Sequence, residues 1–307
     1  MNSIICYQPE FTQNPAVDSR QIVDIHYQHE TRRSLLLNEL AHCQAVLLDP
    51  QAFALHISAR EPGADALAVD TRLQALNQAA IDCVTLPGLN EELRLYALGV
   101  MLSTASNLPQ EAECVQRIAS MPGWLARHAE QGELQRMHGE LPAIDVLKSQ
   151  LIRELGVMSL DWTRLPDHPR SVTLPMQVGL LMLQDANSEA QMQQQLAQVW
   201  QTHGAQCQAQ TPWLLTHYLV YRVYHDLFPG NHPEHSYLQL VCDYFQLKTL
   251  FSLWMMEGTA LSAQEMTALI GLFEQWRVCE AQNQERDCRH ELFAGNDLLA
   301  AFSLIAG

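Results

Sequence analysis

The chain has 307 residues, of which 48% are hydrophobic, and a formal net charge of −16. That length and composition suffice for a sizeable buried core, in one large domain or in two smaller ones. The acidic charge argues against a nucleic-acid-binding protein, because gripping phosphates requires clustered positive charge. It would suit a basic partner, although solubility alone explains it equally well. Lys148 and Lys248 are the only lysines, so arginine supplies the rest of the positive charge.

The cysteines and the apolar runs indicate the cellular compartment of the protein. None of the eight cysteines belongs to a C-x-x-C pair, so no spacing typical of a zinc or iron–sulfur site is present. The start of the chain lacks the basic and apolar regions of a signal peptide. No apolar run approaches the roughly 20 residues that span a membrane. We therefore expect reduced thiols in a cytoplasmic protein, with no bound metal and no membrane contact.

The first half of the chain is predicted to be mainly helical. Residues 1–33 are weakly patterned and fit a short strand or an irregular segment around Ile22 and Tyr27. Beyond them, apolar residues recur at helical spacing, and turns or prolines separate the runs. Asn90 is placed to cap one of these helices. The expected helices cover residues 34–49 and 65–84, and others start near residues 90 and 109 or include 144–155.

The best candidate for a boundary or a long surface loop is residues 164–175, which contain three prolines. This segment would separate an N-terminal helical region, residues 1–163, from a C-terminal helical region, residues 176–307. The same pattern also fits one continuous domain. Further along, Ser262 and Glu265 have the spacing of a capping box, which predicts the start of another helix.

The strongest apolar patterning lies in residues 213–257. Two apolar helical runs meet there at the turn Pro229-Gly230-Asn231-His232-Pro233. Glycine suits the position just after a helix end, and proline suits the first turn of the next helix. We predict a buried C-terminal helical hairpin in this segment. For the whole chain we predict an all-α fold, a multi-helix globular bundle.

The residues around this turn suggest little chemistry by themselves. Its histidines lack the H-x-x-x-H spacing of a metal site, so positions at helix ends are the simpler interpretation. Arg222 and Asp226 are one helical turn apart, which predicts a surface ion pair. Nucleotide-binding and catalytic signatures such as G-x-G-x-x-G and H-E-x-x-H are missing. From the residues alone, a helical interaction or chaperone-like protein fits better than an enzyme.

A resemblance to a known family points elsewhere. The segments LLTHYLVYRVYHDLFPG (214–230) and YLQLVCDYFQLKTLF (237–251) resemble the C-terminal part of flagellin lysine-N-methylases. Weaker similarity extends over most of the chain, in residues 8–11, 34–50 and 94–99 and in the pair Arg277 and Glu280. The resemblance implies a role in flagellin modification or flagellar biogenesis, with flagellin as the partner. It also implies lysine methylation, with S-adenosylmethionine as a possible cofactor.

The sequence departs from this family in one respect. Members carry a cysteine-rich N-terminal cluster, thought to bind an iron–sulfur centre, but residues 12–33 of this chain contain no cysteine. Enzymatic activity as a protein-lysine N-methyltransferase is therefore left open, and no catalytic residue can be carried over. A partner that supplies the cofactor site would be one way to retain methylation.

Four residues near the turn are candidates for binding a substrate lysine. If the turn faces a groove, Asp226 or Glu234 would pair with the ammonium group. Tyr221 or Tyr237 would contact the aliphatic stem through apolar and cation–π contacts. The alternative for the tyrosines is ordinary packing in the core.

Overall fold

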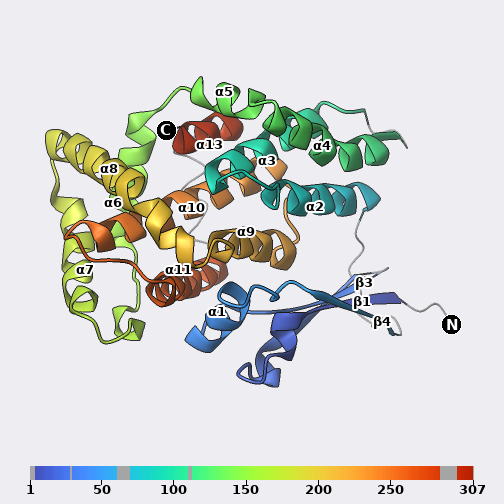
Figure 1. The fold of residues 1–307 in the computed structure, drawn as a ribbon, viewed down its shortest axis with the longest axis horizontal. Helices are drawn as coiled ribbons and strands as arrows, with labels where there is room; N and C mark the ends of the chain where they lie inside the picture. Colours follow the sequence, from blue (N-terminus) through green and yellow to red (C-terminus); the bar gives the residue numbers. More distant parts are fainter. Residues whose placement is uncertain (1–3, 28–29, 61–69, 110–112, 284–295, 307) are drawn as a thin grey trace.

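The computed structural model describes residues 4–27, 30–60, 70–109, 113–283 and 296–306 (Figure 1). The described chain is mostly helical, with a small sheet near its N-terminal end. The helices are α1 Leu40–Leu47, α2 Thr71–Val84, α3 Glu91–Ser106, α4 Glu113–Glu130, α5 Glu133–Gly139, α6 Asp145–Val157, α7 Pro169–Leu180, α8 Ala186–Gln210, α9 Leu214–His225, α10 Pro233–Met255, α11 Ala263–Asn283 and α13 Asp297–Ile305.

The sheet corrects the prediction of an all-α fold. Its strands are β1 Ile4–Pro9, β2 Ile22–His26, β3 Glu30–Leu35 and β4 Leu55–Arg60, in the order β2-β3-β1-β4. Strand β1 is parallel to β3, and the β1–β4 and β2–β3 pairs are antiparallel. Because β3 extends to Leu35, the helix expected from residue 34 begins only at Leu40. The sheet lies beside α1, at one end of the molecule (Figure 1).

The predicted helix starts are confirmed where a capping side chain fixes them. The Oδ1 atom of Asn90 accepts a hydrogen bond from the Leu93 amide at 2.9 Å. In the capping box, the Glu265 carboxylate accepts from the Ser262 amide at 2.6 Å, and the Ser262 hydroxyl accepts from the Glu265 amide at 3.3 Å. These bonds satisfy amides that have no partner within the helix.

The proline-rich segment 164–175 is only partly a loop. Helix α7 begins inside it at Pro169, after His168 accepts a hydrogen bond from the Arg170 amide. The buried Arg170 guanidinium donates to the Leu253 carbonyl in α10. Buried hydrophobic side chains from before and after this segment belong to a single continuous core.

Helices α9 and α10 are both deeply buried, but different neighbours bury them. Helix α9 packs mainly against α2 and α1, whereas α10 packs mainly against α13 and α8. The predicted burial of both runs is thus observed, while the two helices make few contacts with each other. The turn between them directs α10 away from α9 and through the middle of the helical layers (Figure 1).

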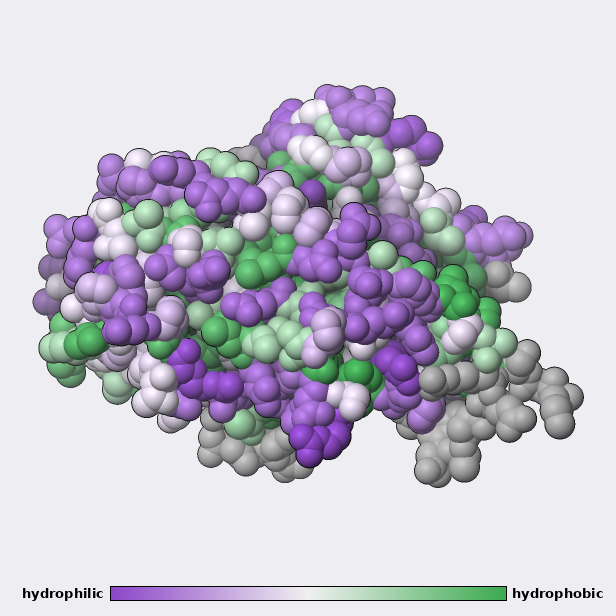
Figure 2. All heavy atoms as spheres, turned by 60° about the horizontal axis from the view of Figure 1, so that its bottom comes forward, coloured by the Kyte–Doolittle hydropathy of each residue, from purple (hydrophilic) through white to green (hydrophobic). Residues whose placement is uncertain are grey.

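The described helices were compared with the requirements for a membrane-spanning segment. Within the parts of the chain that the structure describes, no helix combines the length and the apolar character needed to cross a bilayer. Figure 2 shows a face on which hydrophilic residues predominate and hydrophobic ones are interspersed.

Gly99 allows three helices to meet closely, and its replacement tests this packing. A Cβ atom at this position of α3 would lie 2.5 Å from Tyr237 Oη in α10 and 2.5 Å from Phe302 Cε1 in α13. We expect Gly99→Ala to lower the free energy of unfolding by about 1–3 kcal/mol, because the core is overpacked. Urea denaturation measures this loss in the free energy of unfolding. Gly123→Ala in α4, where nothing lies within 4 Å, is the control. Equal stability of the two variants would contradict the close contact.

Candidate functional site

The turn between α9 and α10, residues 226–235, is called the elbow here. Asn77 of α2 anchors the elbow, and the Asn77 side chain is fully buried. The Asn77 amide donates hydrogen bonds to the carbonyls of Val223 at 2.8 Å and Phe228 at 2.7 Å. Its Oδ1 atom accepts from Arg32 of β3 at 2.6 Å. One side chain thus connects the sheet, α2 and the elbow.

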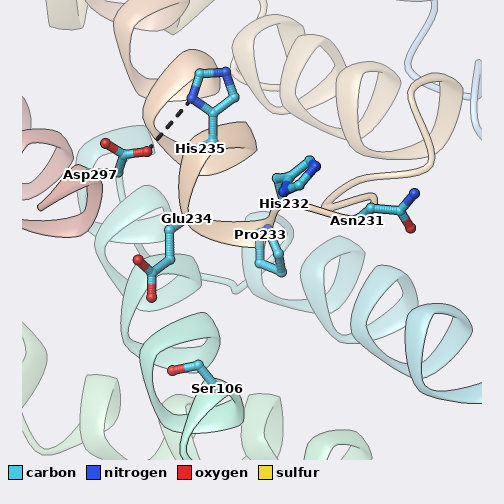
Figure 3. Close-up of a pocket in the computed structure, with 7 residues that line it drawn as sticks. All are labelled: Ser106, Asn231, His232, Pro233, Glu234, His235 and Asp297. Carbon is cyan, nitrogen blue, oxygen red and sulfur yellow. Dashed lines mark ion pairs between the residues drawn. The ribbon is translucent and has the colours of Figure 1, made fainter. Parts of the chain in front are cut away.

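Residues 231–235 of the elbow border a pocket of about 550 Å³, here called the elbow pocket (Figure 3). Its lining comes from three places in the chain: the elbow, the end of α3 and the start of α13. The lining residues are Ser106, Asn231, His232, Pro233, Glu234, His235 and Asp297. Two of them, Glu234 and Asp297, are carboxylates, and none of these seven is a lysine or an arginine. The pocket therefore favours a cation.

The acidic groups of the elbow pocket differ in environment. Glu234 is exposed, and Figure 3 shows its side chain pointing away from His235, toward the side of Ser106. Asp297 is nearly buried, with Oδ2 3.6 Å from His235 Nδ1. The amide of Gln239 lies 2.8 Å from His235 Nε2. Since an amide nitrogen can only donate, this contact places the proton of a neutral imidazole on Nδ1, facing Asp297.

Of the four predicted substrate-binding residues, the structure places only Glu234 in this pocket. Tyr221 and Tyr237 are 1% and 0% exposed. Their hydroxyls donate to the carbonyls of Leu35 at 3.1 Å and Leu95 at 2.8 Å. The expectation that these tyrosines line a groove is corrected, because neither has surface to offer a lysine stem. They pack in the core.

Asp226 lies at the other end of the elbow and faces α11. Its carboxylate is 3.0 Å from Arg222 and 3.2 Å from Arg277. Burial by itself would raise the pKa of Asp226, but the guanidinium groups of Arg277 and Arg222 hold it below its usual value. Asp226 is therefore an ion-pair partner within the protein, and it does not share a pocket with Glu234.

The predicted pair of Arg222 and Asp226 is present, but it belongs to a buried network. Arg222 is 5% exposed, so its expected place at the surface was wrong. Its Nη1 atom donates to Asp243 at 2.9 Å and to the Tyr218 hydroxyl at 2.9 Å, and it lies 3.4 Å from Glu274. Arg277 pairs with the other oxygen of Glu274 at 2.7 Å. Two arginines thus neutralise carboxylates from the elbow, α10 and α11.

The histidines of α9 act as structural residues. His217 Nδ1 lies 3.1 Å from the Val46 carbonyl, and His225 Nδ1 lies 2.7 Å from the Ser34 hydroxyl. Burial lowers the pKa of both imidazoles. In the described portion of the chain, no group of three or more His, Cys, Asp or Glu side chains is arranged to hold a metal ion.

A second pocket of about 550 Å³, here called the apolar pocket, lies between β4, α2 and α9. Aromatic and aliphatic side chains, including Phe53, Trp213 and Tyr224, form most of its lining. Arg94 stands at its polar side and hydrogen bonds to Thr216 and to the Leu86 carbonyl. Sequence reasoning missed this pocket, because its walls come from four separate segments.

These features define a mostly helical protein with an acidic, cation-favouring pocket at the elbow and an apolar pocket of about the same volume between β4, α2 and α9. The chain belongs to the FliB family: the sequence model of the FliB lysine N-methylase C-terminal domain matches residues 77–297. The match confirms the resemblance seen in the sequence. It includes the elbow, the elbow pocket and the buried ionic network, whereas the sheet lies outside it. No curated protein and no solved structure matches the chain.

Proposed function

We propose that this protein acts in flagellin modification by binding lysine-bearing segments of flagellin in the elbow pocket for methylation. The observation that carries the proposal is the pairing of Glu234 and Asp297 around one cavity within the matched region. An ammonium group is the chemical feature that such a pocket recognises, since two carboxylates attract it and no described lining residue repels it.

Methyl transfer to lysine requires more than attraction of the ammonium. The amine becomes nucleophilic only after it loses a proton, so a nearby titratable group must accept that proton. His235, adjacent to Asp297, would take this proton at Nε2, and the Gln239 amide would rotate to present its oxygen to the N–H that forms. The carboxylate of Asp297 would stabilise the imidazolium that forms.

The cofactor of the proposed reaction is S-adenosylmethionine, which would supply the methyl group. The apolar pocket offers aromatic surface at Trp213 and Phe53 and a guanidinium at Arg94, but it shares no lining residue with the elbow pocket. Arg94 and Ser106 lie near opposite ends of α3, about 18 Å apart along the helix, so a cofactor held there would not reach a lysine in the elbow pocket, and a partner would have to supply the cofactor site. Arg94 belongs to the short motif shared with the family. Six of the described cysteines are free thiols, namely Cys6, Cys43, Cys83, Cys114, Cys207 and Cys279, which supports a cytoplasmic setting for this role.

The proposal is tested by mass spectrometry of flagellin lysines from cells with and without the gene. We expect lysine methylation to disappear without the gene and to return when it is restored. Flagellin binding without any change in methylation would instead support a helical interaction or chaperone-like role. Absence of both would contradict the proposal.

The role of the elbow pocket in binding has its own test. We expect the double change Glu234→Gln and Asp297→Asn to weaken binding of a lysine-bearing flagellin peptide about 5- to 25-fold, because each charge contributes roughly 0.5–1 kcal/mol. Titration calorimetry at low salt measures it, and the wild-type affinity should fall as salt rises. The matched control is Glu140→Gln, just after the end of α5, where Glu140 pairs with Arg136 at the surface. Unchanged affinity of the double variant would remove the pocket from the mechanism.

A further inference from the structure

Both lysines of the chain line one small pocket that shares no lining residue with the elbow pocket. The pocket has a volume of about 110 Å³ and is bounded by α6, α8, α10 and the end of α13. Lys148 enters it from α6 and Lys248 from α10. Every other positively charged side chain of this protein, histidines aside, is an arginine. The ammonium group of lysine is smaller than the planar guanidinium of arginine, so it leaves more of this small pocket open to a ligand.

The two ammonium groups keep donors available for a ligand. Lys148 Nζ donates to the carbonyl of Ala306 at 2.6 Å, which carries no charge. Lys248 Nζ pairs with Glu92 and lies 5.7 Å from the centre of the Trp200 ring. Each ammonium has three N–H groups, so the Ala306 carbonyl and the Glu92 carboxylate each use one donor of their lysine.

The pKa of Lys148 supports the closeness of these charges. Burial lowers it, and the positive charge of Lys248 lowers it further, while Asp145 and Glu92 act in the opposite direction. Among the described residues, Glu92 pairs with Lys248. The two lysines therefore place two positive charges at one cavity of a protein whose net charge is −16, and Glu92 and Asp145 offset them in part.

The remaining walls restrict the kind of anion. Ile152, Leu196, Phe245 and Leu304 contribute apolar surface to the lining. The amide of Gln193 is already engaged with Asp145 and Ser149, and the hydroxyls of Thr249 and Ser252 donate within α10. The lining thus combines two cations with hydrocarbon.

We propose that this pocket binds a small aliphatic carboxylate, with its carboxylate group between Lys148 and Lys248 and its short hydrocarbon tail against the apolar wall. Burial of the tail distinguishes such a ligand from an inorganic anion, which gains nothing from the apolar side. The site does not depend on the role of the elbow pocket.

Titration calorimetry at constant ionic strength tests the proposal, with butyrate as the probe and inorganic phosphate in parallel. We expect saturable butyrate binding that Lys148→Met weakens about tenfold or more, since a charge-assisted contact is lost. Arg153→Gln is the matched control, because Arg153 lies on the same helix and pairs with Glu189 at the surface. Its affinity should stay within about twofold of the wild type.

Lys248→Met is the second variant and should also weaken butyrate binding if Lys148→Met does not fold. Thermal melts of each variant verify folding. Absence of saturable butyrate binding to the wild-type protein would overturn the proposal. Butyrate affinity that is unchanged in a folded lysine variant, or phosphate binding tighter than butyrate, would overturn it as well.

Discussion

Replacing Arg222 with methionine is expected to lower the free energy of unfolding by about 3–5 kcal/mol. The guanidinium lies between Asp243 and Glu274, whose side chains are 0% and 1% exposed. Methionine keeps much of the aliphatic stem but removes the charge, so Asp243 loses its arginine partner in the interior. A buried carboxylate without a cation is strongly unfavourable, because the surrounding protein replaces little of the hydration that it has lost.

Urea denaturation at neutral pH measures this effect. Arg136→Met is the matched control, since Arg136 forms a single ion pair with Glu140 at the surface. Surface pairs of this kind contribute about 0–1 kcal/mol, so the control should change stability little. Similar losses in the two variants would contradict a buried network at the centre of α9, α10 and α11.

The sequence predicted the helices and their caps well, and the reason is local. Apolar residues at helical spacing and the capping side chains of Asn90 and Ser262 act within one or two turns, so they can be recognised without knowledge of the fold. The same locality explains the error at residue 34. The run Ser34-Leu-Leu-Leu37 fits a helix start, but Leu35 ends strand β3 and is buried beneath its neighbours.

Only one strand of the sheet was among the expectations: a short strand around Ile22, weighed against an irregular segment, is observed as β2. The rest was not predicted, because its signals are short and its pairing is distant. Each strand has only five or six residues, too few for a clear alternation. Strand β3 reads Glu-Thr-Arg-Arg-Ser-Leu, and its buried Arg32 pairs with Glu30 in the same strand and with Asn77, far along the chain. No residue near β3 in the sequence indicates that Asn77 will be a partner of Arg32.

The candidate site was predicted in part for a similar reason. Glu234 was found because it follows a conspicuous turn. Asp297 was missed because only the packing of α13 against α10 brings it beside His235. Tyr221 and Tyr237 were assigned to a groove because their spacing is the same for a surface stripe and for a buried face. Their exposure depends on the neighbouring helices, which the spacing does not specify.

Asn77 is the residue whose loss should disturb the sheet and the elbow together. We expect Asn77→Leu to lower the free energy of unfolding by about 3–5 kcal/mol, since it deprives three buried groups of a hydrogen bond at about 1–3 kcal/mol each. Leucine has a similar size, so an empty cavity does not explain the loss. Asn107→Leu, whose exposed amide donates to the Ser103 carbonyl at 2.8 Å, is the matched control and should change stability by about 0.5 kcal/mol or less.

The same variant links stability to the site. Without Asn77, the carbonyls of Val223 and Phe228 lose the donor that holds the elbow against α2. Glu234 then projects from a less constrained turn, although it makes no contact with the substituted side chain. We therefore expect Asn77→Leu, measured where it is still folded, to bind the lysine-bearing peptide more weakly than Asn107→Leu does. Equal affinities would show that the elbow pocket keeps its shape without this anchor, and the role of Asn77 would then be confined to stability.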